Sequence, residues 1–370
     1  MASTRRTARI IALAAAAAAA GAAAWRFRDI PAALGRRPSG ERLARIESSP
    51  QFRDGAFHNA GGLGAATITG IRSVIRDRRA NKAPTKPLLP VPLATPDPAP
   101  GPGAHVTWYG HASALVDLDG TRVLLDPVWG DRCSPSLVTG PRRLHPSPAA
   151  LEDLPHIDAV LISHDHYDHL DMPTIKAIAR DRTAPFLVPL GIGAHLESWG
   201  VPAERIVEMD WDDAHAVGDV TLTLTAAQHF SGRGLKRNTS LWGSWVIAGP
   251  RHRVFYTGDS GYFDGYRAIG AAHGPFDATL VQIGAYSPAW PDIHMTPEDA
   301  ARAHLDLNGG LLIPVHWCTF DLAFHAWGEP VDRLWREAKA RGISLTVPRP
   351  GQTVDVANAP EPDGWWQGLA

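Results

Sequence analysis

One short stretch of the chain concentrates the side chains that most often bind transition metals. Residues 163–169 read Ser-His-Asp-His-Tyr-Asp-His. Imidazole and carboxylate groups suit zinc-like ions, and burying so many of them without partners would be costly. The spacing His164-x-His166 lets two rings grip one ion, and the pair Asp168-His169 can hold a second ion nearby. A solvated polar loop is the alternative, but it does not explain why nearly every polar residue here is a metal-ligand type.

One loop supplies too few ligands for two ions, so the others must come from elsewhere in the chain. Three isolated ligand-type residues each lie shortly after an apolar segment: His229, Asp259 and His316. Each one alone is as consistent with a buried core or turn residue as with a ligand. Taken together, in this order after the first loop, they predict the remaining ligands of a two-metal site.

The elements that must position these residues are short strands interleaved with helices. Turn residues separate apolar strands from residue 105 onward, and Asp119-Gly120 marks a hairpin. Strands are expected at 106–109, 114–118, 122–125, 159–162, 186–188, 220–226, 241–248, 254–257, 279–283 and 311–315. Helices are expected at 40–47, 71–79, 172–181, 193–199, 296–307 and 331–340. Because strands and helices interleave in two halves, we expect an α/β sandwich of sheets with helices outside.

The chain of 370 residues divides into four predicted segments. Residues 1–30 carry a basic start and an apolar run at 10–24, which is shorter than the ~20 residues that span a bilayer. This pattern predicts a bacterial protein that is exported by a signal peptide or held by an N-terminal membrane anchor; an Ala-rich tail without function is the third interpretation. Residues 31–103 form an extension whose proline-rich end predicts an extended linker. Residues 104–356 are the predicted catalytic domain, and 357–370 a C-terminal tail.

The net charge and the number of cysteines argue against two classes of protein, nucleic-acid-binding proteins and disulfide-rich domains. The net charge is −2, with 36 basic and 38 acidic residues, so no basic excess points to a nucleic-acid partner. The only two cysteines, Cys133 and Cys318, cannot build a disulfide scaffold and are expected to be separate core residues, although one bridge between them is compatible with the sequence. A homo-oligomer is also compatible with it.

The seven predicted ligands, in their order along the chain, resemble the signature of the metallo-β-lactamase superfamily. The resemblance implies a four-layer αβ/βα sandwich and a pair of ions, expected to be two Zn²⁺ per chain, with Mn²⁺ or Fe²⁺ as alternatives. One ion would be held by His164, His166 and His229. The other would be held by Asp168, His169 and His316, with Asp259 bridging both ions.

Longer runs between the ligands carry a closer resemblance. They are residues 107–112, 126–129, 241–245, 274–277, 283–286 and 316–320. These runs look like N-acyl-phosphatidylethanolamine-hydrolysing phospholipase D, and the likeness covers about residues 105–356. It implies a phosphodiesterase of the phospholipase D type that acts on a phospholipid or another phosphodiester, with a membrane surface as a further partner.

The same resemblance implies roles for individual residues. Asp168 and Asp259 would orient the attacking water in addition to binding the ions. His294 and Tyr167 would contact the substrate, and His294 would also be catalytic; a core aromatic is the alternative for Tyr167. His111 and Asp126 either hydrogen-bond to ligand histidines or are ordinary core and turn residues.

Two other functions stay open at this point. A hydrolase of a small cyclic phosphodiester or a sugar-phosphate lactone would share the ligand set but lack an acyl-binding groove. A metal-binding scaffold without turnover is the alternative from another class, although such proteins usually lose a ligand. A β-lactamase of this fold would commonly carry a cysteine ligand, and neither Cys133 nor Cys318 occupies a ligand position.

Overall fold

The computed structural model of the chain describes residues 21, 25, 27–62 and 69–369. The apolar run at 10–24, on which the predicted signal peptide or anchor depends, lies outside the described residues apart from residue 21. Within the described part of the chain, no helix is long and apolar enough to cross a membrane.

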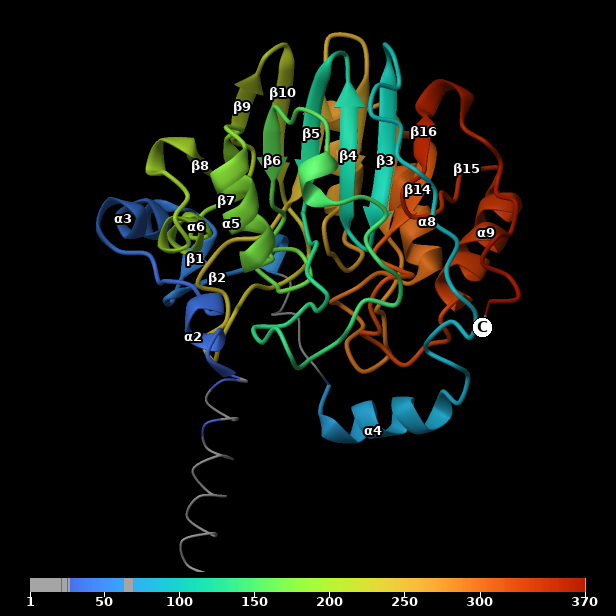
Figure 1. The fold of residues 1–370 in the computed structure, drawn as a ribbon, viewed down its shortest axis with the longest axis horizontal. Helices are drawn as coiled ribbons and strands as arrows, with labels where there is room; N and C mark the ends of the chain where they lie inside the picture. Colours follow the sequence, from blue (N-terminus) through green and yellow to red (C-terminus); the bar gives the residue numbers. More distant parts are fainter. Residues whose placement is uncertain (1–20, 22–24, 26, 63–68, 370) are drawn as a thin grey trace, which may run out of the picture.

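Two seven-stranded sheets face each other at the centre of the molecule (Figure 1). The first sheet has the order β16 (Thr353–Asp355), β3 (Ala104–Gly110), β4 (Ser113–Leu118), β5 (Thr121–Leu125), β6 (Ala159–Leu161), β7 (Phe186–Pro189) and β8 (Ile206–Met209). The second has the order β15 (Ser344–Leu345), β14 (Gly309–Val315), β13 (Phe276–Gln282), β12 (Arg253–Tyr256), β11 (Ser244–Ala248), β10 (Val220–Thr225) and β9 (Ala214–Val217).

Helices cover the outer faces of the two sheets. The helices α5 (Met172–Asp181) and α6 (Gly193–Ser198) lie over the first sheet, and α7 (Gly265–His273), α8 (Pro297–Asp306) and α9 (Glu329–Arg341) lie over the second (Figure 1). The start of α8 is fixed by a capping box, in which Thr296 and Asp299 bond to each other's backbone amides. The predicted four-layer αβ/βα sandwich is confirmed.

The largest hydrophobic core lies between the two sheets. Trp108 and Val116 enter it from the first sheet, and Leu222, Trp245 and Phe255 enter it from the second; all five are buried. A second core fills the space between the first sheet and its helices, because alternate residues of β4, β5 and β6 point outward. Both faces of each sheet therefore carry buried apolar residues.

The direction of the strands places the candidate site at one end of the sandwich. In the first sheet β3 and β5 to β8 run in one direction, and in the second sheet β10 and β12 to β15 do so. The carboxyl ends of these strands form the lower end in Figure 1. The chain leaves three of the strands through left-handed residues: His111 (φ 51°), Asp126 (φ 35°) and His316 (φ 61°).

The residues before and after the predicted catalytic domain pack against it. The extension contains α2 (Ile30–Ala33), α3 (Gly40–Ser48), the hairpin β1 (Phe52–Arg53) and β2 (Ala56–Phe57), and α4 (Ile71–Ala80). Its Ile46 and Phe57 join the main core. The proline-rich segment is extended, and its Ala94 amide donates to the Pro350 carbonyl at 2.9 Å. In the C-terminal segment, Trp366 is buried in the same core.

The observed elements differ from the predicted ones in a few places. The strand predicted at 241–248 begins only at Ser244, because the amides of Leu241 and Gly243 donate to the carbonyls of Leu190 and Ser163 instead of to β10. The strands β8, β9, β15 and β16 and the helix α7 have no counterpart in the prediction. Cys133 and Cys318 are free and buried, so the prediction of two separate core cysteines is confirmed.

Candidate metal centre

All seven predicted ligands meet at the carboxyl ends of the strands. Three groups of described side chains place their ligand atoms within 4.8 Å of one another, and the smallest of them joins His294 to Asp259 and His316. The first contains His164, His166, His229 and Asp259, and the second contains Asp168, His169, His316 and His111. Below, "first half" means His164, His166 and His229, and "second half" means Asp168, His169 and His316.

The first half is built from three ring nitrogens that point at one place. The Nε2 atom of His164 lies 2.8 Å from Nδ1 of His166, which lies 3.3 Å from Nε2 of His229. His164 and His229 are fully enclosed by the protein. Nitrogens this close repel one another unless a proton or a cation lies between them, so the arrangement suits a bound ion.

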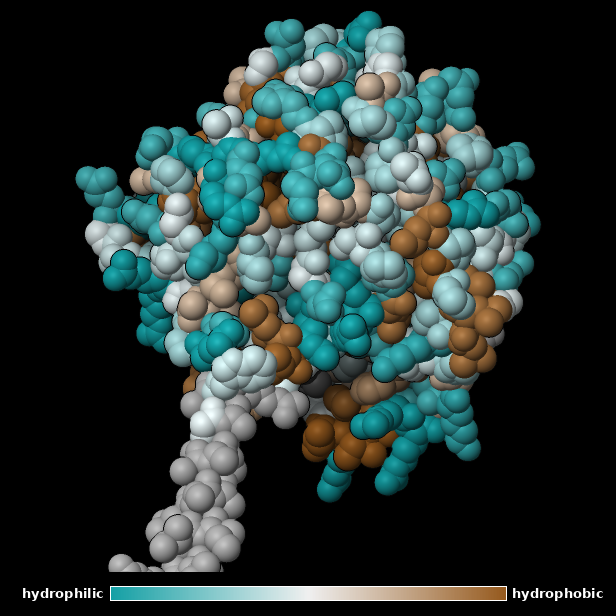
Figure 2. Space-filling model, viewed as in Figure 1, coloured by the Kyte–Doolittle hydropathy of each residue, from teal (hydrophilic) through white to brown (hydrophobic). Residues whose placement is uncertain are grey.

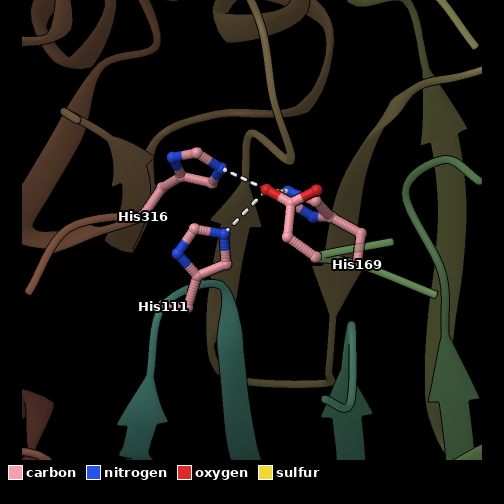
Figure 3. Close-up of side chains that lie close together, drawn as sticks. His111, His169 and His316 are labelled. Carbon is pink, nitrogen blue, oxygen red and sulfur yellow. Dashed lines mark hydrogen bonds and ion pairs between the residues drawn. The ribbon is translucent and has the colours of Figure 1, made fainter. Parts of the chain in front are cut away.

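The second half combines a carboxylate with two rings. Asp168 Oδ2 lies 3.3 Å from His316 Nε2 and 3.7 Å from His169 Nε2. Figure 3 shows the rings of His111, His169 and His316 gathered around one carboxylate. A mixed nitrogen and oxygen donor set of this kind suits zinc and similar divalent ions.

The carboxylate of Asp259 lies between the two halves. Its Oδ2 is 3.1 Å from His169 Nε2 and 3.8 Å from His164 Nε2, and its Oδ1 is 3.1 Å from His316 Nε2. The preceding Gly258 adopts φ 57°, and a Cβ there would lie 2.6 Å from the Cβ of Ser163. Only glycine therefore lets the chain bring Asp259 this close to the metal loop.

The donor set fits a pair of divalent ions. His169 Nε2 and Asp259 Oδ1 are buried, and neither has a hydrogen-bond partner among the residues that the structure describes. Buried polar atoms are almost always satisfied. Here each of the two atoms has another predicted ligand 3.1 Å away without forming a hydrogen bond, so the space between these ligands suits a cation. The identity of the ions and their number stay predictions.

Asp126 holds one ligand of the second half in place. Its Oδ2 accepts from Nδ1 of His169 at 2.7 Å, and its Oδ1 accepts from the Ser163 amide at 2.7 Å. The Tyr256 hydroxyl, from the second sheet, also donates to this carboxylate. A carboxylate behind a ligand histidine fixes the ring and its tautomer. Of the two interpretations of Asp126, the structure supports the hydrogen bond to a ligand.

His111 hydrogen-bonds to a different kind of predicted ligand from the one that its interpretation named. Its Nε2 is 2.9 Å from Asp168 Oδ2, so it contacts a ligand carboxylate, whereas the prediction was a ligand histidine. Burial, with His316 beside it, lowers the pKa of His111 to about 3. The ring is therefore neutral, and its Nε2–H donates to Asp168.

Hydrogen bonds to uncharged groups, and not to a carboxylate, support His229 in the first half. His229 Nδ1 donates to the Ile293 carbonyl at 3.0 Å, and the His229 amide donates to Asn59 Oδ1 at 3.0 Å. Asn59 belongs to the N-terminal extension, so this segment reaches the metal centre directly. The sequence alone gave no signal for this role, because the contact spans 170 positions.

The two predicted substrate contacts occupy different settings. His294 Nε2 lies 3.3 Å from Asp259 Oδ2, and its Nδ1 lies 3.3 Å from the Gly284 carbonyl. It therefore stands at the edge of the metal centre. The hydroxyl of Tyr167 donates to the Arg233 carbonyl at 2.6 Å, so this hydroxyl points toward the loop that follows His229. Substrate contact stays a prediction for both residues.

A buried arginine ties the metal loop to the extension. The Arg233 guanidinium donates to the carbonyls of Ala33, Asp165 and Leu170 at 2.7 to 2.8 Å. It also lies over the ring of Tyr167, 4.1 Å from the centroid. Charge-assisted bonds to three carbonyls make Arg233 a strong clamp on both ends of the histidine-rich loop.

The electrostatic settings of the two halves differ. Burial lowers the pKa of His164, His166 and His229, so these rings are neutral. Burial acts in the same direction on His316, but the Asp259 and Asp168 carboxylates overcome it and raise its pKa to about 9. The same balance, with Asp259, Asp168 and Asp126, raises the pKa of His169 well above its ordinary value.

Comparison with known proteins agrees with this geometry. Residues 121–317 match the family model described as a beta-lactamase superfamily domain, and all seven predicted ligands lie within this range. The chain belongs to the metallo-β-lactamase superfamily. Its members of similar sequence and structure include metal-dependent hydrolases, and this chain is a metal-dependent hydrolase of that superfamily.

Individual relatives of this superfamily member cover most of its length. Uncharacterized protein Rv0906 of Mycobacterium tuberculosis is 50% identical over 369 residues, covering 97% of this chain and 99% of the relative. N-acyl-phosphatidylethanolamine-hydrolyzing phospholipase D 1 of Caenorhabditis elegans is 36% identical over 252 residues, covering 65% of this chain and 71% of the relative. The structure of Igni18, a metallo hydrolase from the archaeon Ignicoccus hospitalis, aligns with a TM-score of 0.53 and 25% identity, covering 68% of this chain and 97% of that one.

Proposed function

We propose that the chain is a two-metal phosphodiesterase of the phospholipase D type, acting on N-acyl-phosphatidylethanolamine or a similar phosphodiester lipid. In this reaction water attacks phosphorus, the bond from phosphorus to the head-group oxygen breaks, and the leaving oxygen takes up a proton. The products would be phosphatidic acid and an N-acylethanolamine.

The position of Asp259 is the observation that carries the hydrolase part of the proposal. A carboxylate within 3.1 to 3.9 Å of ring nitrogens from both halves is what two ions acting on one phosphate require. The lipid part is supported by the 36% identity over 252 residues to the C. elegans phospholipase D.

The residues of the chain would share the work as follows. When bound, a pair of ions supplies Lewis acidity at a phosphoryl oxygen and lowers the pKa of water. Asp168 and Asp259 would help to orient the attacking water as well as hold the ions. His294 lies beside Asp259, and its Nδ1–H donates to the Gly284 carbonyl. In its imidazolium form the ring would carry a second N–H at Nε2, which could donate to a phosphoryl oxygen or protonate the leaving group.

The substrate is tested by comparing long-chain, short-chain and chain-free phosphodiesters on one preparation of the metal-loaded protein. Each buried methylene contributes about 0.8 kcal/mol to binding, so a lipid enzyme should lose kcat/KM steeply as chains shorten. Mass spectrometry of the released head groups identifies the bond that is cleaved. Equal efficiency on all three substrates would overturn the lipid assignment and favour a small cyclic phosphodiester or lactone as substrate.

His294→Ala separates substrate contact from metal binding. We expect kcat/KM for the lipid to fall by about two orders of magnitude, in the range of a lost general acid, with metal content unchanged. His273→Ala, at the end of α7 away from the site, is the matched control and should retain full activity. Loss of metal in His294→Ala would show that this histidine is a ligand instead. An absence of metal-dependent turnover on any phosphodiester would leave the scaffold alternative.

A further inference from the structure

The lower end of the molecule carries exposed apolar side chains among unpaired basic ones. Figure 2 shows hydrophobic atoms gathered over α4 beside strongly hydrophilic ones that project outward. In α4, Ile71 is 71% exposed and Ile75 is 44% exposed, and none of its residues is buried. The two isoleucines are four positions apart, so they share one face of the helix.

The charge of α4 faces away from the protein. Residues 71–82 carry four arginines and Lys82 against the single acid Asp77, which leaves a charge of +4. Asp77 is directed inward, where it accepts from Ser287 Oγ and from Asn81 Nδ2. The arginines are exposed, and among the described residues none has a carboxylate partner: Arg72, Arg76, Arg78 and Arg79. The whole chain has a net charge of −2, so this charge is a local feature.

A second place where an exposed apolar side chain lies beside basic ones is the loop after the predicted metal ligand His229. Leu235 is fully exposed at the tip of this loop and is followed by exposed Lys236 and Arg237. Leu34 of the extension, 40% exposed, lies beside it, since a Cβ on Gly234 would be 3.6 Å from Leu34 Cδ2. Because Leu235 is fully exposed, its side chain does not contribute to the hydrophobic core.

Both elements border the metal centre. The Arg237 guanidinium lies 4.8 Å over the Phe230 ring, which contacts the ring of His166 at 4.5 Å. On the other side, Thr69 before α4 donates to the Ala289 carbonyl, in the segment whose Gly284 carbonyl bonds to His294. Lipid that enters between the two elements would meet the first half and His294.

We propose that α4 and the loop at residues 234–237, called here the basic rim, bind the surface of an anionic phospholipid bilayer. Apolar side chains that project singly between arginines suit the interface, where they enter the acyl boundary while guanidinium groups bind phosphates. Basic residues close to a membrane surface are attracted to anionic lipid head groups. The positive charge of the basic rim is therefore complementary to the negative charge of such a surface. The choice of a lipid partner rests on the proposed function, and the surface itself is defined independently of turnover.

Vesicle flotation of the full-length protein tests the basic rim. The probes are phosphatidylcholine vesicles and vesicles of phosphatidylcholine with phosphatidylglycerol, at low and high salt. We expect preferential binding to the anionic vesicles that weakens with salt, and a loss of at least about tenfold in partitioning for Arg72→Glu/Arg76→Glu. Ile71→Asn/Leu235→Asn should reduce binding to both vesicle types.

The control is Arg336→Glu/Lys339→Glu, which makes the same charge change on the exposed face of α9. It should bind like the unaltered protein. All variants should keep their circular dichroism, their metal content and their turnover of a soluble chain-free phosphodiester. Undiminished binding of the α4 variant, equal loss in the control, or retention on heparin without binding to vesicles would overturn the bilayer assignment. Vesicle binding without lipid turnover would instead leave the basic rim intact and count against the proposed substrate.

Discussion

The two halves of the metal centre reach similar geometry through different supports. The first half is supported by neutral groups: the Ile293 carbonyl holds His229, and the Ser163 hydroxyl lies 2.9 Å from Nδ1 of His164. In the second half, the carboxylate of Asp126 holds His169, and His111 holds the carboxylate of Asp168. Neutral supports leave the imidazoles uncharged, with one N–H each, whereas histidines surrounded by carboxylates keep a second proton until a metal ion displaces it.

The largest expected effect comes from the residue that the halves share. Asp259→Asn removes the charge that would bridge both ions, so we expect turnover to fall by at least about a thousandfold and the bound metal to decrease. Elemental analysis and phosphodiesterase assays measure the two effects. Asp264→Asn, a highly exposed neighbour at the start of α7, is the control and should behave like the unaltered protein. Retention of more than about a tenth of the activity at full metal occupancy would contradict the mechanism.

A change in the carboxylate that holds His169 should affect the ion of the second half more than the other ion. Asp126→Asn keeps the shape of the side chain but removes the charge behind His169, and such supports are worth about 10- to 100-fold in metal affinity. Metal retention during titration with a chelator should then become biphasic, with one ion lost early. If both ions leave together, the two halves are not separable in the way their supports suggest.

The pH dependence of metal binding should also separate the halves. In the metal-free protein the pKa of His316 is raised to about 9 and that of His169 is raised as well, so protons must leave before an ion binds. Affinity of the second half should therefore increase as the pH rises from about 6 toward 9, while the first half, whose pKa values are lowered, should change little in this range. Competition titrations at several pH values, with proton release measured in parallel, test this. Equal slopes for both ions would contradict it.

The smallest expected effect is that of His111→Asn. Asparagine tolerates the left-handed backbone at this position (φ 51°), but its shorter side chain cannot reach Asp168 as the ring does. We expect about a tenfold weaker second ion and a fold that is otherwise retained. His156→Asn, on an exposed loop, provides the comparison. A loss as large as that of Asp259→Asn would make His111 a ligand, and its membership of the second metal group gives that outcome a geometric basis.

The sequence predicted the sandwich and the candidate ligands because both depend on local signals, whereas the division of the ligands between two ions came from the family resemblance. The buried strands are continuous apolar runs, and the ligand motif lies directly after one of them. Strand direction then brings distant ligands together without any further information, since parallel strands end at the same edge. For the same reason His229, Asp259 and His316 could be found by their place after apolar runs.

The supports of the site could not be predicted, because they depend on contacts between distant segments. Tyr256 reaches Asp126 from the opposite sheet, and Arg233 reaches Ala33 across 200 positions. The strands β8 and β9 carry polar or partly exposed residues, so they lack the hydrophobic pattern that identified the others. The extension gave only a weak pattern, since its main contribution is single residues such as Phe57 that complete a core built by other segments.

The distribution of ligands over the two sheets gives the ions a mechanical role. The loop at residues 163–169 leaves the first sheet, whereas His229, Asp259 and His316 leave the second, so each half joins ligands from both. Bound metal would therefore act as a cross-link that closes the lower end of the sandwich, where no strand of the described residues pairs with the opposite sheet. An ion present at a hundredfold excess over its Kd adds about 2.7 kcal/mol to the free energy of unfolding. Chelation should thus lower the melting temperature before any ligand is changed, and the unfolding curve would report how many cross-links are in place.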